Sequence, residues 1–159
     1  MNSSSAENIP TREHIGVYGI HLKPDNQVLL ILKGRGPYKG MYDLPGGGIK
    51  KNETKEEALN REYKEEIGTG ILSYKFLYED VVTFPYMSPS EGKVTFRHKG
   101  YFYIVSLPSD VKIKMSPDGF DSMGAMYVNI SDIIEDKVIV APIARKAILC
   151  AISVYITKP

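Results

Sequence analysis

The hydrophobic positions of the chain fall mostly into short runs that are rich in β-branched and aromatic residues and are bounded by Gly, Pro, Asn and Asp. Such runs predict β-strands, here over residues 13–22, 27–33, 71–84, 93–107 and 125–130. The turn sequence KPDN joins the first two runs and predicts a hairpin between them. The sequence YMSPSEG joins the next two and predicts an antiparallel pair.

Two other segments carry the signals of α-helices. Thr54 followed by Glu57 matches a capping box, acidic residues occupy the first turn, and Gly68 supplies a stop. A second helix begins at Pro142, after which apolar residues recur with helical spacing. This apolar stripe is expected to face the core and consists of Ile143, Ala147, Ile148, Ala151, Ile152 and Tyr155.

The segment between the second strand and the first helix, GRGPYKGMYDLPGGG, is rich in Gly and Pro. It predicts a long ordered loop with at most a short strand at 42–44. Strands flanked by two helices favour one layered α/β domain over residues 12–159, and the Ser-rich residues 1–11 are expected to form a flexible tail. Long ordered loops such as GRGPYKGMYDLPGGG often carry functional residues.

Composition narrows the class of protein. The chain has 159 residues, of which 43% are hydrophobic and 25% charged, as is usual for one globular domain. The net charge of +1 gives no overall attraction to nucleic acid or an anionic membrane, and we expect neither a DNA-binding domain nor a membrane segment. The only cysteine, Cys150, lies in an apolar run and is expected to be a buried thiol, which fits the cytoplasm.

The first predicted helix gathers carboxylates. Glu62, Glu65 and Glu66 fall within an arc of roughly 100° around the helix axis. Like charges at this spacing repel by a few tenths of a kcal/mol per pair, so a bound cation is one reason for the pattern. Several carboxylate oxygens are the ligands that Mg²⁺ or Mn²⁺ requires. The alternative is a solvated acidic face in which Arg61 pairs with Glu57 or Glu65, next to glycines that form an ordinary tight turn.

The glycines and the acidic helix together resemble the motif of a known family. Gly47, five residues, Glu53, seven residues and then REYKEEIG at 61–68 resemble the Nudix box, G-x5-E-x7-R-E-U-x-E-E-x-G-U, where U is a bulky aliphatic residue. Every fixed position of the motif matches, which makes the signal far more specific than a glycine motif alone. Tyr63 and Thr69 depart from the aliphatic positions, which concern packing rather than chemistry.

The resemblance to this MutT-like hydrolase family implies an α/β/α sandwich around a central mixed β-sheet, with the box as a loop-helix-loop. It also implies Mg²⁺-dependent attack of water on the diphosphate linkage of a nucleoside diphosphate joined to another moiety, with Mn²⁺ as a substitute metal. By position, the implied metal ligands are Glu62, Glu65, Glu66 and the Gly46 carbonyl. Arg61 and Glu53 resemble the supporting pair that orients these carboxylates.

The remaining roles depend on weaker signals. Glu65 is a candidate general base, whereas Asp118 and Asp121 lie in a segment that equally fits a surface turn. Arg35 is the best phosphate-binding candidate in a basic cluster with Lys33 and Lys39. An aromatic residue often precedes the box, so Tyr42 is a tentative substrate contact. Aromatic residues in strands are typical of the core, which applies to Tyr18, Phe84 and Tyr86, and His98 is interpreted as structural.

Two other functions remain open at this point. A non-catalytic nucleotide sensor could use the same fold, although such a protein is expected to have a damaged acidic set or an added regulatory domain. An isoprenoid diphosphate isomerase would need a reactive cysteine, and Cys150 lies in a predicted core helix. The sequence fixes neither the group attached to the diphosphate nor whether the protein forms a homodimer.

Overall fold

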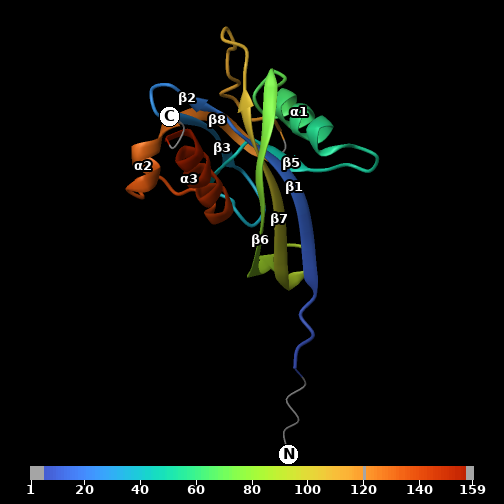
Figure 1. The fold of residues 1–159 in the computed structure, drawn as a ribbon. Coiled ribbons are helices and arrows are strands. Elements are labelled where there is room, and N and C mark those ends of the chain that lie inside the picture. The colour runs from blue at the N-terminus through green and yellow to red at the C-terminus, as the bar shows by residue number, and fades with distance from the viewer. Residues whose placement is uncertain (1–5, 120, 157–159) are drawn as a thin grey trace, which may run out of the picture.

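The structure is a computed structural model that describes residues 6–119 and 121–156. Its strands are β1 (Thr11–Ile20), β2 (Leu22–Lys23), β3 (Gln27–Lys33), β4 (Tyr42–Asp43), β5 (Gly46–Gly48), β6 (Ser73–Ser88), β7 (Gly92–Ser106) and β8 (Ser122–Asn129). Its helices are α1 (Lys55–Glu66), α2 (Ile130–Ile134) and α3 (Pro142–Ile156). Figure 1 shows α1 on one side of the strands, with α2 and α3 on the other.

The strands form two four-stranded sheets. The first has the order β5-β1-β7-β6, in which β1 and β7 run parallel and the other neighbours are antiparallel. In the second, β3 pairs with β8 along its length and also with β2 and β4, always antiparallel. The architecture is therefore a mixed sheet system between helices, which confirms the predicted fold class.

Side chains of β1 alternate between the two hydrophobic cores. Val17 belongs to the core beneath α1, whereas Tyr18 and Ile20 belong to the core beneath α3. The predicted capping box is present, because the Glu57 amide donates to Thr54 Oγ1 and the Thr54 amide donates to Glu57 Oε2, both at 3.1 Å. A fixed helix start sets which face of α1 meets the sheet, and Tyr63 is fully buried on that face.

The predicted hairpin across the KPDN turn is present but short. Leu22 and Lys23 of β2 pair with Val28 and Gln27 of β3, whereas β1 does not pair with β3. Instead β1 pairs with β7 and β5, both of them distant in the chain. A short turn between two strand-like runs favours local pairing, but the hydrophobic pattern alone cannot identify the partner of a strand that is buried on both faces. The strand at Gly46–Gly48 and the short helix α2 were also not predicted.

The predicted antiparallel pair is confirmed and is longer than expected. β6 and β7 pair from Ser73 with Ser106 to Ser88 with Gly92, and together with β1 they extend beyond the body of the molecule (Figure 1). On α3 the predicted stripe is buried at Ile143, Ala147, Ile148 and Ala151, but Tyr155 is 54% exposed. Cys150 is half-buried rather than buried. Tyr155 and Cys150 therefore do not lie in the core as predicted.

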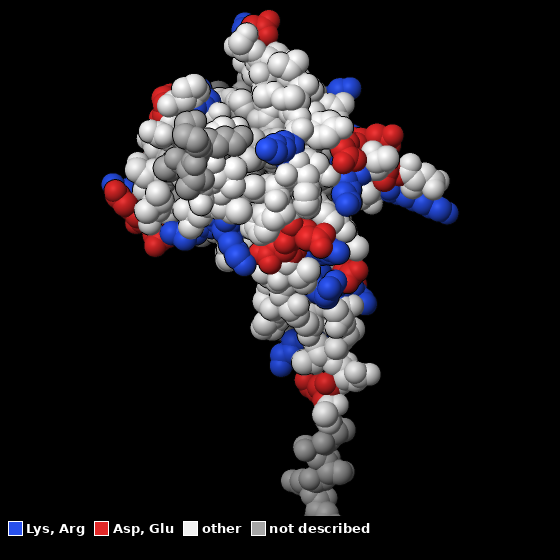
Figure 2. Space-filling model, viewed as in Figure 1, with Lys and Arg blue, Asp and Glu red and all other residues white. Residues whose placement is uncertain are grey.

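Two surface properties bear on the expected partners. Among the described residues, no helix is both long enough and apolar enough to cross a bilayer. On the face seen in Figure 2, Lys and Arg are interspersed with Asp and Glu, and no continuous basic patch is visible there. The mixed charges on this face agree with a chain whose net charge is close to zero.

Candidate active site

The three glycines of β5 bring backbone close to α1 and β1. Gly46 has φ +148°, and a Cβ atom there would lie 2.1 Å from the Val17 carbonyl oxygen. A Cβ on Gly47 would lie 2.6 Å from Glu62 Oε1, whereas one on Gly48 would only reach His14 at 3.5 Å. The triple glycine is therefore a strand, in which Gly46 allows the close approach of β1 and Gly47 allows that of Glu62.

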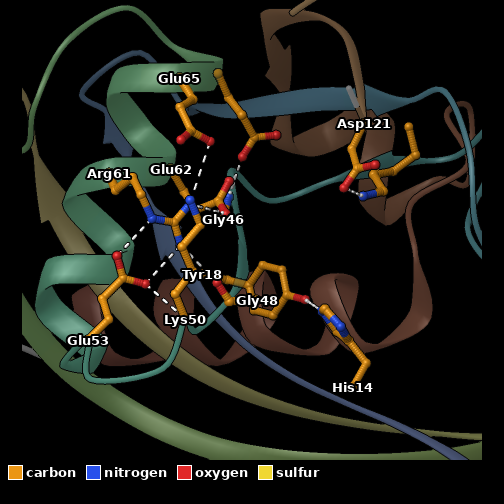
Figure 3. A network of polar contacts seen from close by, with 12 residues as sticks. His14, Tyr18, Gly46, Gly48, Lys50, Glu53, Arg61, Glu62, Glu65 and Asp121 are labelled. Carbon is orange, nitrogen blue, oxygen red and sulfur yellow. Dashed lines mark hydrogen bonds and ion pairs between the residues drawn. The ribbon is translucent and has the colours of Figure 1, made fainter. Parts of the chain in front are cut away.

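Arg61 organises the acidic side of this site (Figure 3). Its Nε and Nη2 atoms donate to the two carboxylate oxygens of Glu53 at 2.7 and 2.9 Å, and Nη2 also donates to the Gly48 carbonyl at 2.9 Å. Nη1 donates to Glu62 Oε1 at 2.9 Å and lies 3.5 Å from Glu65 Oε2. One guanidinium thus holds the loop before α1 and two carboxylates of α1 in a fixed arrangement.

These contacts shift the pKa values of Glu53 and Arg61. The hydrogen bonds from Arg61 and from the Lys50 amide lower the pKa of Glu53 to about 2. The hydrogen bond to Glu53 raises the pKa of Arg61, which therefore remains charged. Burial raises the pKa of Glu62, although Arg61 opposes that rise. Glu53 and Arg61 stay ionised across the neutral range and can serve as a permanent support.

Glu66 is the most deeply buried carboxylate of the box. It is 3% exposed, its Oε1 accepts a hydrogen bond from the Gly46 amide at 2.8 Å, and its Oε2 has no hydrogen-bond partner among the described residues. Burial raises its pKa well above the usual range, and the charge of Glu62 adds to that rise. A buried carboxylate oxygen without a partner is costly, and a cation bound there would satisfy it.

The oxygen donors of these residues suit a hard divalent cation, but the side chains are not yet arranged around a common point. Among the described residues, no three acidic, His or Cys side chains are already gathered at ion-binding distances. The physical reason is visible in Figure 3, where Arg61 ties Glu62 and Glu65 to itself. The unpartnered oxygen of Glu66 and an all-oxygen donor set match Mg²⁺, which commonly takes its remaining ligands from water and from substrate phosphate.

A pocket of about 270 Å³ opens beside β5. Its wall combines charged groups with aromatic and imidazole rings and includes His14, Tyr18, Arg35, Asp43, His98 and Asp121. Figure 3 shows the Arg61 network on α1 and the Tyr18–His14 pair on opposite sides of Gly48. The carboxylate cluster and the pocket therefore meet along the glycine strand.

The basic cluster predicted beside the loop partly lines this pocket. Arg35 pairs with Asp121, and Lys33 Nζ lies 3.6 Å from the same carboxylate. Burial raises the pKa of Asp121, but the hydrogen bond from Arg35 and the charge of Lys33 outweigh it and lower the pKa overall. Asp118 caps the local turn by accepting a hydrogen bond from the Ser122 amide at 3.1 Å. Asp121 thus reaches the pocket, whereas Asp118 has a structural contact.

Tyr42 lies elsewhere. Its ring is half-buried and packs against the core under α3, and its backbone forms a bridge with Val140. Tyr42 does not line the pocket described above.

Sequence reasoning missed several residues of the pocket. Asp43 is 4% exposed, and its burial raises its pKa to about 6 despite the charge of Lys33. Tyr38 and His14 were not considered, and His98 was considered only as a structural residue. A signal for Asp43 did exist, because an acidic residue between Tyr42 and Leu44 interrupts a segment that otherwise reads as buried.

Comparisons with known proteins agree with this geometry. A family model described as NUDIX domain matches residues 12–147. The chain is 48% identical over 54 residues to an ADP-ribose pyrophosphatase of Methanocaldococcus jannaschii, a match that covers 34% of this chain but only 31% of that protein. It is 27% identical over 123 residues to an RNA pyrophosphohydrolase of Helicobacter pylori, covering 75% of this chain and 79% of the relative.

Among solved structures, the fold is similar to the NUDIX domain of Shewanella oneidensis NrtR complexed with ADP ribose. The TM-score is 0.63 at 17% identity, and the match covers 91% of this chain and 89% of that one. At this identity the similarity concerns the fold.

Proposed function

Since the chain belongs to the NUDIX domain family, we propose that it is a divalent-metal-dependent pyrophosphohydrolase that cleaves the diphosphate linkage of a nucleoside diphosphate joined to another group. The observation that carries the proposal is the buried Glu66, whose unpartnered oxygen lies beside the Arg61-bound carboxylates and along the glycine strand from a polar pocket. Mg²⁺ is the proposed metal, with Mn²⁺ as a substitute, and the cytoplasm is the proposed compartment.

In this proposal Glu62, Glu65, Glu66 and the Gly46 carbonyl hold the metal. The bound metal would neutralise phosphate charge and lower the pKa of water. Arg61 positions two of the three carboxylates, and Glu53 fixes Arg61 through both of its oxygens. Because its side chain is 43% exposed and only loosely paired with Arg61, Glu65 is the carboxylate best placed to take a proton from the attacking water.

The phosphate groups need cationic partners on the pocket side. Arg35 lines the pocket and is 63% exposed, although Asp121 currently holds it. An anionic diphosphate would compete with Asp121 for this guanidinium, and Lys33 lies within reach of the same carboxylate. We therefore assign Arg35 to substrate phosphate. Tyr42 is not part of this proposal, because its ring packs against the core.

A substrate panel tests the proposal. Purified protein with Mg²⁺ is incubated with ADP-ribose and 5′-triphosphate RNA first, because relatives are named for those activities, and then with dNTPs and nucleotide sugars. The expected result is release of a phosphate-containing product from at least one substrate, and loss of most of that rate in Glu66→Gln. No turnover on any substrate, at neutral or alkaline pH, would refute hydrolysis.

The alternative is a nucleotide sensor without catalysis. It predicts nucleotide binding with no turnover in the wild-type protein, so the same panel separates the two. The acidic set of the box is complete, and its supporting contacts are in place. These features support the hydrolase.

A further inference from the structure

One wall of the pocket is a continuous chain of hydrogen bonds between rings. Tyr38 Oη lies 2.8 Å from His98 Nδ1, and His98 Nε2 lies 2.8 Å from Tyr18 Oη. Tyr18 Oη also lies 3.3 Å from His14 Nε2. All four side chains line the pocket, and none belongs to the acidic cluster on α1. The metal-binding proposal gives these four hydrogen-bonded side chains no role.

The imidazole of His98 restricts the directions of the hydrogen bonds in this ring network. His98 is 1% exposed, and burial with the nearby His14 and Lys33 charges lowers its pKa to about 3, so its ring is neutral at physiological pH. A neutral imidazole donates from one nitrogen and accepts at the other. One of its two tyrosine partners must therefore donate to His98, and the other must accept from it.

This constraint couples the hydrogen-bonding states of Tyr38 and His14, the two ends of the ring network. If Tyr18 donates to His98, then Tyr38 accepts and its own O–H can donate elsewhere, while His14 Nε2 donates to Tyr18 and His14 Nδ1 is an acceptor. If all directions are reversed, the Tyr38 oxygen offers an acceptor and His14 Nδ1 a donor. The wall can thus present a donor with an acceptor in either order, without any net charge.

A ring platform accompanies these groups. Phe96 lines the same pocket and is half-buried, and its ring lies nearly parallel to His14, with an interplanar angle of 19° and centroids 6.3 Å apart. The wall begins directly behind the glycine strand, because a Cβ on Gly48 would lie 3.5 Å from His14 Cε1. One face of β5 therefore meets Glu62, and the other meets this aromatic wall.

We propose that the wall formed by His14, Tyr38 and Phe96 is the nucleobase subsite. A nucleobase offers a flat face for stacking and an edge that carries donors next to acceptors, which is what an uncharged wall with a coupled donor–acceptor pair can bind. A further phosphate would be a poor occupant of this wall, because Tyr38 and Phe96 are uncharged and burial lowers the pKa of His14. The inference rests on the proposed function, which places the diphosphate between the acidic cluster and Arg35.

Non-hydrolysable analogues test the subsite. The probes are the α,β-methylene diphosphates of adenosine, guanosine, cytidine and uridine, and methylenediphosphonate is the base-free control. Each is titrated calorimetrically into the protein with Mg²⁺. At least one nucleoside analogue is expected to bind at least about ten-fold more tightly than methylenediphosphonate, as base stacking predicts.

Substitutions in the wall test which side chains provide the affinity that the base adds. Tyr38→Phe should weaken the preferred nucleoside analogue roughly 2- to 12-fold, the value of one hydrogen bond, and leave methylenediphosphonate unchanged. Phe96→Leu should weaken it roughly 5- to 150-fold through lost stacking. Tyr78→Phe is the matched control, because the Tyr78 hydroxyl is buried with no hydrogen-bond partner in the described part of the chain and its ring packs on Phe102 outside the pocket. Thermal unfolding checks that each variant is folded, and either of the first two suffices for the test.

The outcomes separate the two proposals. If methylenediphosphonate binds and no base adds affinity, or if Tyr38→Phe and Phe96→Leu match Tyr78→Phe, the nucleobase subsite is refuted while the proposed function stands. If neither methylenediphosphonate nor any nucleoside analogue binds with Mg²⁺, the proposed function is refuted and the subsite with it.

Discussion

Replacing Glu66 by Gln should make the metal-free protein more stable and the enzyme inactive. The substitution keeps the shape of the side chain and the oxygen that accepts the Gly46 hydrogen bond, and it removes a charge from a position that is 3% exposed. The second oxygen, which has no partner, becomes an amide group. Stability and activity should therefore change in opposite directions at one residue.

The magnitude follows from burial. In the folded wild type, Glu66 either stays charged in a buried site close to Glu62 or takes up a proton because its pKa is raised, and both choices cost free energy relative to the unfolded chain. A buried charged group without its hydrogen bonds costs about 1–3 kcal/mol or more. Glutamine avoids most of this cost, so we expect a gain of about 1–3 kcal/mol, or roughly 2–12 °C in Tm for a chain of this length.

The assay is thermal and urea unfolding in EDTA at pH 8, repeated with Mg²⁺. Glu65→Gln is the matched control, because Glu65 lies on the same helix but its side chain is 43% exposed, and its stability should change by less than about 0.5 kcal/mol. Mg²⁺ should raise the Tm of the wild type and have little effect on Glu66→Gln, since a ligand stabilises only the state that binds it.

Two results would contradict this reasoning. A metal-free Glu66→Gln protein that is less stable than the wild type would show that the buried carboxylate has partners that stabilise it. A variant that keeps full activity and the full Mg²⁺-dependent rise in Tm would show that Glu66 does not hold the metal.

Three other predictions follow from single contacts. Arg61→Lys cannot reproduce the forked contacts of the guanidinium, so kcat/KM should fall at least about ten-fold and unfolding should show a loss of about 1–3 kcal/mol. Gly47→Ala should lower kcat by displacing Glu62, whereas Gly48→Ala, with 3.5 Å to its nearest neighbour, should keep near-normal activity, and equal effects would contradict the geometry. For His98, whose pKa falls from 6.5 to about 3 on folding, the unfolded chain binds a proton that the folded protein refuses, so stability decreases as pH falls from 6.5 towards 3. Between pH 7 and 5 the wild type should lose about 2 kcal/mol more than His98→Gln in urea unfolding, and parallel pH profiles would contradict a buried neutral imidazole.

The acidic side of the site could be predicted from the sequence because it is local. Glu62, Glu65 and Glu66 share a helix, and helical periodicity alone brings them to one face. The capping box fixes where that helix begins. The supporting contact from Glu53 to Arg61 spans only eight residues, which is why a linear motif can encode it.

The pocket could not be predicted in the same way, because its wall is assembled from distant segments. His14 and His98 are brought side by side by the parallel pairing of β1 with β7, and Tyr38 approaches them from a loop. The hydrophobic pattern of a buried strand records that it is buried but not which strand lies next to it. The same ambiguity made the predicted hairpin longer than the two residue pairs that β2 forms with β3.

The sequence by itself thus determined the helix, its row of carboxylates and the flexible glycines beside it, since backbone geometry acts over a few residues. Only the tertiary structure decided that the glycines form a strand with Glu62 on one face and His14 on the other. It alone also left Glu66 with a buried, unpartnered oxygen and joined Tyr38, His98, Tyr18 and His14 into one hydrogen-bonded wall. Burial and long-range strand pairing are properties of the packed chain, and no local pattern contains them.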